Sequence, residues 1–410
     1  MTNDGPKGST RTLSFAFLAL CFFGSGLTAL IYELIWLRRL QLTFGSTTYS
    51  LSTVLAAFMA GLGFGSYLVG RWVDRSRLGG IRIYAYLELG IGFFGIFSLP
   101  LLWVAEMAFA RSQSFLELGP GGTSLLKFLF AFPVLAIPAG LMGGTLPALV
   151  RGLVQERGEL GEMVGKLYGI NTAGAALGTA LTGLLFIELV GLWSTIAVAV
   201  CINLGIGFLV LMRVRGLYDP DDPNADEGPA YEPSPDPDAP EVQLRDHLRQ
   251  GPVLFCAVAV LLTGGLSMLY EVAWTRMLSL VVGSSTYAFT IVLTIFLLGL
   301  ALGSLIYGFL YKPGRWQVSV RSLTLVLLLL AFWVSLTLAM IPRLPLAMLW
   351  MIQLPGASFL RLISFDAAMA IFLLLVPTIL LGAALPMSIS IISRATGQLG
   401  RDVGGAYLVN

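Results

Sequence analysis

The feature that most constrains this chain is a succession of long apolar stretches. An α-helix needs about 20 apolar residues to cross the roughly 30 Å hydrocarbon core of a bilayer. Ten stretches of that kind cover residues 14–34, 47–70, 84–108, 124–150, 164–187, 190–212, 252–272, 285–311, 321–342 and 362–393. We therefore expect an all-α polytopic membrane protein of about ten transmembrane helices, surrounded by lipid bilayer.

Composition agrees with a lipid-facing surface. Charged residues make up 12% of the chain, whereas a soluble domain carries about 25%. The net charge of +2 gives no basis for nucleic-acid binding. Cys21, Cys201 and Cys256 lie in apolar runs without motif spacing, and His247, the one histidine, lies in a polar segment. The sequence therefore predicts no metal site, and no cofactor or catalytic residue, in this chain.

Lys and Arg in the short connections predict the orientation of the chain in the membrane. They occur at the N-terminus and after the second, fourth and eighth stretches: Lys7, Arg11, Arg71, Arg75, Arg77, Arg82, Arg151, Arg157, Lys166, Lys312, Arg315 and Arg321. All of them share one side if the N-terminal segment, residues 1–13, is cytoplasmic. Arg38 and Arg39, which follow the first stretch, break this pattern.

Residues 213–250 differ in character from the rest of the chain. The segment is rich in proline and acidic residues and has almost nothing to bury, which is typical of a disordered linker. The charge pattern places it in the cytoplasm. A solvated tether is the simpler interpretation, and a regulatory segment is the alternative.

The regions on either side of the linker, residues 14–212 and 251–410, are repeats of each other. Positions 26–70 align without gaps to 264–308, and 19 of these 45 positions are identical. A second block aligns at an offset of 239 residues: Pro138, Gly143, Pro147, Gly161, Gly165, Tyr168 and Asn171 match Pro377, Gly382, Pro386, Gly400, Gly404, Tyr407 and Asn410. Six spans separate equivalent helices, so the repeats are parallel, as in major facilitator transporters. The second repeat stops after about four helices, and we expect the full-length protein to continue beyond Asn410.

One repeated cluster combines aromatic, acidic and basic side chains. Its members are Tyr32, Glu33, Trp36 and Arg38, which recur as Tyr270, Glu271, Trp274 and Arg276. An interfacial belt with snorkelling arginines would explain all of them except the glutamates. A carboxylate near the membrane is costly unless it is paired or functional. Two hypotheses follow: a structural Glu–Arg pair, or a ligand site in which the carboxylate and the rings bind an amine. In either case we expect Glu33 and Glu271 to face the protein interior.

Other repeated or polar positions suggest packing or conformational roles. Small residues at a spacing of four, which let helices approach closely, are Gly61, Gly65 and Gly70, then Gly299, Gly303 and Gly308, and finally Gly174 and Gly178. They favour simple packing, with a moving helix interface as the functional alternative. Glu88 is a carboxylate in the third stretch, for which proton coupling or structural pairing can be considered. Its equivalent in the second repeat is Val326.

The loop after the second stretch, Gly70-Arg-Trp-Val-Asp74-Arg75, resembles the loop motif of the major facilitator superfamily. In that superfamily the Asp and Arg form a cytoplasmic charge latch that steadies one conformation. The resemblance implies such a latch at Asp74 and Arg75. The second repeat has Lys312-Pro-Gly-Arg315 at the corresponding place and therefore lacks the Asp.

Five segments together resemble the membrane part of the bacterial fused major facilitator/spermidine synthase-like proteins. They are Ala29-Leu-Ile-Tyr-Glu-Leu-Ile-Trp-Leu-Arg, Phe44-Gly-Ser-Thr-Thr-Tyr, Ala56-Ala-Phe-Met-Ala-Gly-Leu-Gly-Phe-Gly-Ser, Gly144-Thr-Leu-Pro and Leu167-Tyr-Gly-Ile-Asn-Thr-Ala-Gly-Ala-Ala-Leu-Gly. The resemblance implies a location in the bacterial cytoplasmic (inner) membrane. It also implies a cytoplasmic aminopropyltransferase-like domain that would bind decarboxylated S-adenosylmethionine and a polyamine. No strand-type glycine-rich nucleotide loop occurs in this chain, so this chain alone cannot perform that chemistry.

Three classes of function are compatible with the sequence. The first is a transporter of small cationic metabolites such as polyamines, or of whatever the fused domain makes. The second is a membrane anchor for an enzyme, and the third is a structural subunit of a larger membrane complex. The two-fold repeat and the glycine-rich helices favour the first.

Overall fold

The computed structural model describes residues 13–44, 48–76, 78–115, 119–154, 160–215, 251–282, 286–310, 318–353, 359–396 and 399–410. These residues are almost wholly helical and include no strand. In order, the elements are α1 (Phe15–Phe44), α2 (Thr48–Arg75), α3 (Gly80–Phe115), α4 (Pro120–Leu153), α5 (Leu160–Leu181), a π-helical turn (Thr182–Phe186), α6 (Ile187–Leu189), α7 (Gly191–Arg215), α9 (Gly251–Val282), α10 (Thr286–Leu310), α11 (Val320–Met340), a 3-10 turn (Ile341–Arg343), α12 (Leu344–Gln353), α13 (Phe359–Thr396) and α14 (Leu399–Val409).

The predicted number of spans is confirmed. Within the described ranges, 10 helical segments are long and apolar enough to cross a membrane. The bundle also carries many large apolar side chains on its outside, for example Leu325, Leu328 and Phe332 of α11. Contiguous exposed apolar surface of this kind is rare on soluble proteins and is expected where lipid is the solvent.

The equivalent helices α1 and α9 each continue ten residues past their predicted ends, at residues 34 and 272. The charged residues that suggested an earlier end are accommodated inside the protein. Glu33 is only 5% exposed, and Nη2 of Arg39 lies 2.7 Å from Oε2 of Glu106 on α3. Arg39 is one of the two arginines that broke the predicted charge pattern. Its pair with Glu106 shows that it has a partner within the bundle.

The two repeats pack their helices through equivalent residues. A Cβ atom added to Gly26 on α1 would lie 1.9 Å from the carbonyl oxygen of Asn171 on α5. A Cβ atom added to Gly264 on α9 would lie 1.7 Å from the carbonyl oxygen of Asn410, which follows α14. The α1–α5 and α9–α14 contacts therefore correspond, as do the extensive α2–α4 and α10–α13 contacts.

The glycines at a spacing of four act mainly in packing within each half. Gly65 lies against the backbone of Gly140 on α4, and Gly303 lies against the backbone of Ile379 on α13. Gly308 is different, because it approaches the backbone of Gly165 on α5 and so brings the two halves together.

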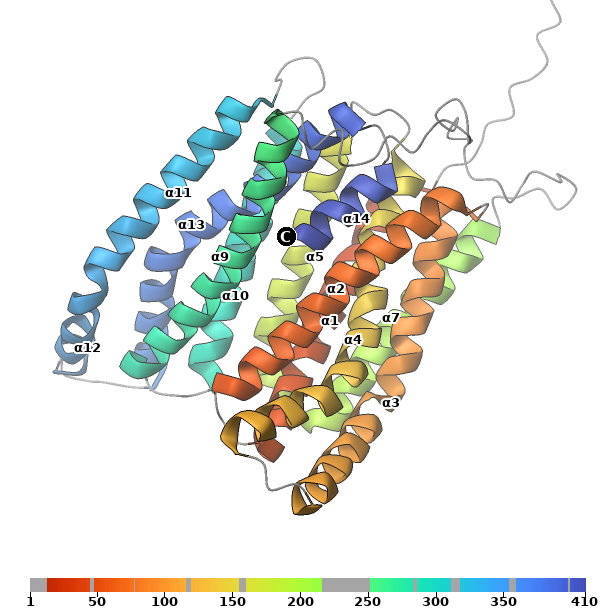
Figure 1. Cartoon of the computed structure of the whole chain (residues 1–410). Helices are drawn as coiled ribbons and strands as arrows, with labels where there is room; N and C mark the ends of the chain where they lie inside the picture. Colours follow the sequence, from red (N-terminus) through yellow and green to blue (C-terminus); the bar gives the residue numbers. More distant parts are fainter. Residues whose placement is uncertain are drawn as a thin grey trace, which may run out of the picture.

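The halves meet along two helix pairs, α5 with α10 and α2 with α14 (Figure 1). We call the side of the bundle where α2 and α7 end and α9 begins the linker face; it is uppermost in Figure 1. The chain ends in the middle of the bundle, between the halves (Figure 1). Of the predicted linker, residues 216–250 lie outside the described residues, as do Lys7, Arg11, Arg77, Arg157, Lys312 and Arg315 among the orienting basic residues.

Candidate functional site

A cavity of about 450 Å³ lies between the two halves. Eight helices line it, four from each half: α1, α2, α4 and α5, then α9, α10, α13 and α14. Its α1 residues run from Phe22 to Glu33, which places it near the middle of that 30-residue helix. A site at mid-depth between repeats is where membrane transporters hold their substrates.

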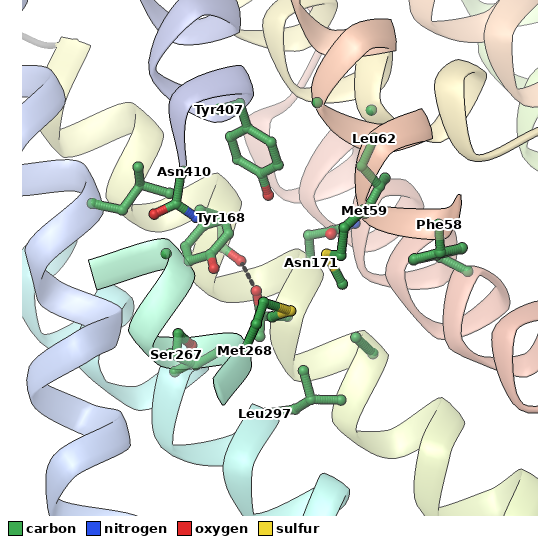
Figure 2. A pocket seen from close by; sticks show the side chains of 18 of the residues that line it. Phe58, Met59, Leu62, Tyr168, Asn171, Ser267, Met268, Leu297, Tyr407 and Asn410 are labelled. Carbon is green, nitrogen blue, oxygen red and sulfur yellow. Dashed lines mark hydrogen bonds between the residues drawn. The ribbon is translucent and has the colours of Figure 1, made fainter. Parts of the chain in front are cut away.

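The cavity wall repeats the symmetry of the sequence. Equivalent positions from the two repeats face the same space: Glu33 and Glu271, Phe58 and Phe296, Met59 and Leu297, Leu62 and Leu300, Tyr168 and Tyr407, and Asn171 and Asn410. Several of these residues appear around the cavity in Figure 2. The lining is mostly apolar, with a small number of polar groups, as in typical small-molecule sites.

Glu33 and Glu271 are the acidic residues of the cavity. Each is 5% exposed, and the two carboxyl groups are close enough to interact electrostatically. Across the described ranges, neither side chain makes a hydrogen bond or an ion pair. Two acidic groups in one largely apolar cavity favour the entry of positive charge.

The structural Glu–Arg pair that the sequence suggested does not form. Glu33 and Arg38 are five positions apart on one continuous helix, whereas helix neighbours are three or four apart. Glu271 and Arg276 have the same spacing on α9. The two glutamates face the cavity, and the arginines lie on another side of their helices, outside the cavity lining.

The aromatic members of the repeated cluster also lie outside the cavity lining. Tyr32 and Trp36 are fully buried in the first half and stack on each other, with ring centroids 5.5 Å apart. Tyr270 and Trp274 form the equivalent pair, with centroids 5.8 Å apart, in a core that includes α13. The rings thus support the helices that carry the glutamates instead of enclosing a ligand beside them.

The cavity contains functional candidates that the sequence interpretation did not select. The rings of Tyr168 and Tyr407 meet edge to face, with centroids 5.9 Å apart. Asn171 Nδ2 donates a hydrogen bond to the carbonyl oxygen of Phe22 at 3.0 Å. These residues and Asn410 gather in one part of the cavity (Figure 2). Their signal was present in the sequence, because both pairs belong to the second repeated block.

The remaining sequence candidates occupy other places. Asp74, at the end of α2, lies 4.0 Å from Nε of Arg151, at the end of α4, while Arg75 is exposed at the linker face. Glu88 is fully buried in α3 and accepts a hydrogen bond from Asn203 of α7 at 2.7 Å. In the part of the chain that the structure describes, no group of three or more His, Cys, Asp or Glu side chains could hold a metal ion.

Comparison with solved structures identifies the fold. The chain is similar to a bacterial homologue of the iron transporter ferroportin, whose crystal structure shows the outward-facing state. The TM-score is 0.57 at 12% sequence identity, over 96% of this chain and 88% of the other. This likeness, with the ten spans, shows a major facilitator-like fold. No protein-family model and no curated protein sequence matches the chain.

Proposed function

We propose that this protein is an alternating-access transporter for small organic cations of the polyamine type. The proposal places it in the bacterial cytoplasmic membrane, with the N-terminus and the linker in the cytoplasm. The major facilitator-like fold supports transport as the general activity. The contents of the cavity support the class of substrate.

The observation that carries the proposal is the pair of carboxyl groups, Glu33 and Glu271, contributed by different halves to one cavity. A polyamine has ammonium groups at both ends of an apolar methylene chain. Its charges would pair with the two carboxylates, and its methylenes would lie against the apolar walls. A substrate held by both halves at once binds more tightly to one arrangement of the halves than to another. Such a difference in affinity is required for a ligand to drive a conformational change.

The other functions suggested by the sequence do not account for this cavity. A membrane anchor or a structural subunit has no need of two buried, unpaired carboxyl groups, which are expensive to keep in a membrane protein. The proposal also includes a fused or associated aminopropyltransferase-like domain, which is supported by the family resemblance alone. Such a domain would act on polyamines near the linker face.

A divalent metal ion is the second candidate substrate. It is suggested by the similar fold of the bacterial ferroportin homologue. Carboxylate and amide oxygens suit hard divalent cations. A divalent ion, however, takes about six ligands, whereas the cavity offers two carboxylates with hydroxyl and amide groups, and no group of three or more His, Cys, Asp or Glu side chains that could hold a metal ion is found in the described residues. The geometry therefore favours the organic cation.

Reconstituted protein tests the proposal. We expect proteoliposomes loaded with spermidine to accumulate radiolabelled spermidine by counterflow, and spermidine to raise the unfolding temperature of the detergent-solubilised protein. Glu33→Gln and Glu271→Gln should each weaken spermidine binding about tenfold or more, because a hydrogen bond to a charged group contributes about 1.5–3 kcal/mol. Glu162→Gln is the matched control, since Glu162 pairs with Lys166 outside the cavity.

The same preparation separates the candidates. Uptake of Fe²⁺ or Mn²⁺ that spermidine does not inhibit, together with no spermidine counterflow, would favour the metal. If well-folded protein transports neither spermidine nor these metal ions, the membrane anchor or the structural subunit becomes the better account.

A further inference from the structure

A third acidic side chain lies one layer behind the cavity. Glu88 of α3 has no exposed surface. Asn203 of α7 donates to its Oε2 at 2.7 Å, and the hydroxyl groups of Ser25 and Tyr84 lie beside the carboxyl group. The site is thus enclosed by α1, α3 and α7, all from the first half.

Three polar atoms of this cluster are buried without a hydrogen-bond partner: Oε1 of Glu88, Oδ1 of Asn203 and Oη of Tyr84. Buried polar atoms are nearly always satisfied in folded proteins, so a group of three calls for an explanation. A proton on Oε1 would account for part of it. The Ser25 and Tyr84 hydroxyl groups can donate to the ionised carboxylate, and once Oε1 carries a proton one of them can instead accept its hydrogen bond.

Burial without a basic partner also favours the neutral acid at Glu88. Among the described residues no basic side chain forms an ion pair with it. The ionisable side chains that face this region are Cys21 and Tyr32 of α1 and Tyr84 of α3, with Arg213 of α7 beside Cys21. From α4, Leu146, Leu149 and Val150 contribute to this core, and the buried Thr145 nearby is polar but not ionisable. Because an isolated carboxylate is expensive in such a place, protonation is the less costly form.

Ser25 connects this cluster to the cavity. It touches Glu88 on one side and lines the cavity on the other. Glu33 lies eight residues further along α1, close to the same side of the helix, and also lines the cavity. A movement of α1 that accompanies substrate binding at Glu33 therefore also moves the residue that covers Glu88.

We propose that Glu88 is a proton-binding site that couples proton movement to transport through the cavity. The O–H bond of the Glu88 acid breaks, the proton passes Ser25 to water in the cavity, and the positive charge of the substrate balances the carboxylate that remains. This proposal rests on the proposed function, because the proton exchanges for a cationic substrate. The equivalent of Glu88 in the second repeat is Val326, so one proton site serves a cavity that is otherwise two-fold symmetric.

The first experiment tests the site without any substrate. Infrared spectra of the purified protein at neutral pH should show a protonated carboxylic acid whose absorption shifts in D₂O. That band should be lost in Glu88→Gln and kept in Glu106→Gln, whose partner is Arg39. An unchanged band in Glu88→Gln would overturn the proton site.

The second experiment tests coupling. In proteoliposomes with a trapped pH indicator, external spermidine should move protons out of the lumen in the wild type. Glu88→Gln should lose this signal and the uphill uptake driven by a pH gradient, while it keeps spermidine counterflow. Uptake driven by a sodium gradient instead, or proton movement that persists in Glu88→Gln, would overturn the coupling role. Absence of counterflow in the wild type would instead reject the proposed function, and the infrared result would still decide whether Glu88 holds a proton.

Discussion

The contact between α1 and α5 provides a quantitative test of the fold around the cavity. The perturbation is Gly26→Ala, which adds one methyl group on the side of α1 that faces α5. The new Cβ would lie 1.9 Å from the carbonyl oxygen of Asn171, whereas real Cβ contacts below 3.0 Å essentially do not occur. The obstacle is helix backbone, so no flexible side chain can turn away. Relief requires α5 to move by roughly 1 Å, in an interior that is packed like a crystal.

The expected energy has two opposing parts. Overpacking of this kind costs about 1–3 kcal/mol. Alanine is favoured over glycine inside a helix by about 1 kcal/mol, which offsets part of that cost. The matched control is Gly205→Ala in α7, where an added Cβ meets nothing within 4 Å. The control should therefore gain stability, and because both variants share the alanine preference, we expect their free energies of unfolding to differ by the overpacking cost alone, about 1–3 kcal/mol.

Thermal and denaturant unfolding in one detergent would measure this difference. We expect Gly26→Ala to unfold at a lower temperature than the wild type, and Gly205→Ala to unfold at the same or a higher temperature. Because Asn171 lines the cavity, the Gly26 variant should also bind spermidine more weakly. If Gly26→Ala matches or exceeds the stability of Gly205→Ala, α1 and α5 are not in the close contact described, and the equivalent α9–α14 contact loses its support.

Two further predictions concern charge. Arg39→Met should destabilise the protein by about 1–3 kcal/mol, because it leaves the buried carboxylate of Glu106 without its partner. The control, Arg38→Met, removes no ion pair in the described structure and should change the unfolding temperature little. Equal effects of the two substitutions would contradict the Arg39–Glu106 pair. Protease should cut residues 217–245 in inside-out membrane vesicles but not in right-side-out vesicles, since the positions of the basic connections predict a cytoplasmic linker. Cleavage confined to right-side-out vesicles would show that the orientation is reversed.

The sequence predicted those features of the fold that a lipid environment requires of the chain. Ten spans and the parallel repeat could be derived because each span must be long and apolar, and because repeated residues preserve their spacing. The end of the first span was placed too early, because hydropathy counts Glu33 and Arg39 as charges in lipid. In the folded protein one of these side chains faces a cavity and the other meets Glu106 of a distant helix.

The composition of the site was harder to predict. Tyr32, Glu33 and Trp36 are neighbours in sequence, but successive residues on a helix point about 100° apart, so only the glutamate of the three lines the cavity. Tyr168 and Tyr407 meet only because the two halves come together. Repetition marked all of these positions as important. It could not distinguish the residues that pack inside one half from those that face the other half.

The arrangement of the acidic groups suggests why transport would need both halves. Glu33 belongs to one half and Glu271 to the other, so any rearrangement of the halves changes the distance between two like charges. Without a cation, the repulsion favours a proton on one of the two carboxyl groups, or states in which the carboxylates are apart or hydrated. A bound dication removes that repulsion and links the halves, so that the loaded protein can pass through compact states that are unfavourable for the empty one. A single carboxylate at this site would bind a dication more weakly, and it would not link the two halves through the substrate. On the proposed function, the repeat would place one carboxylate on each of the two halves that rearrange.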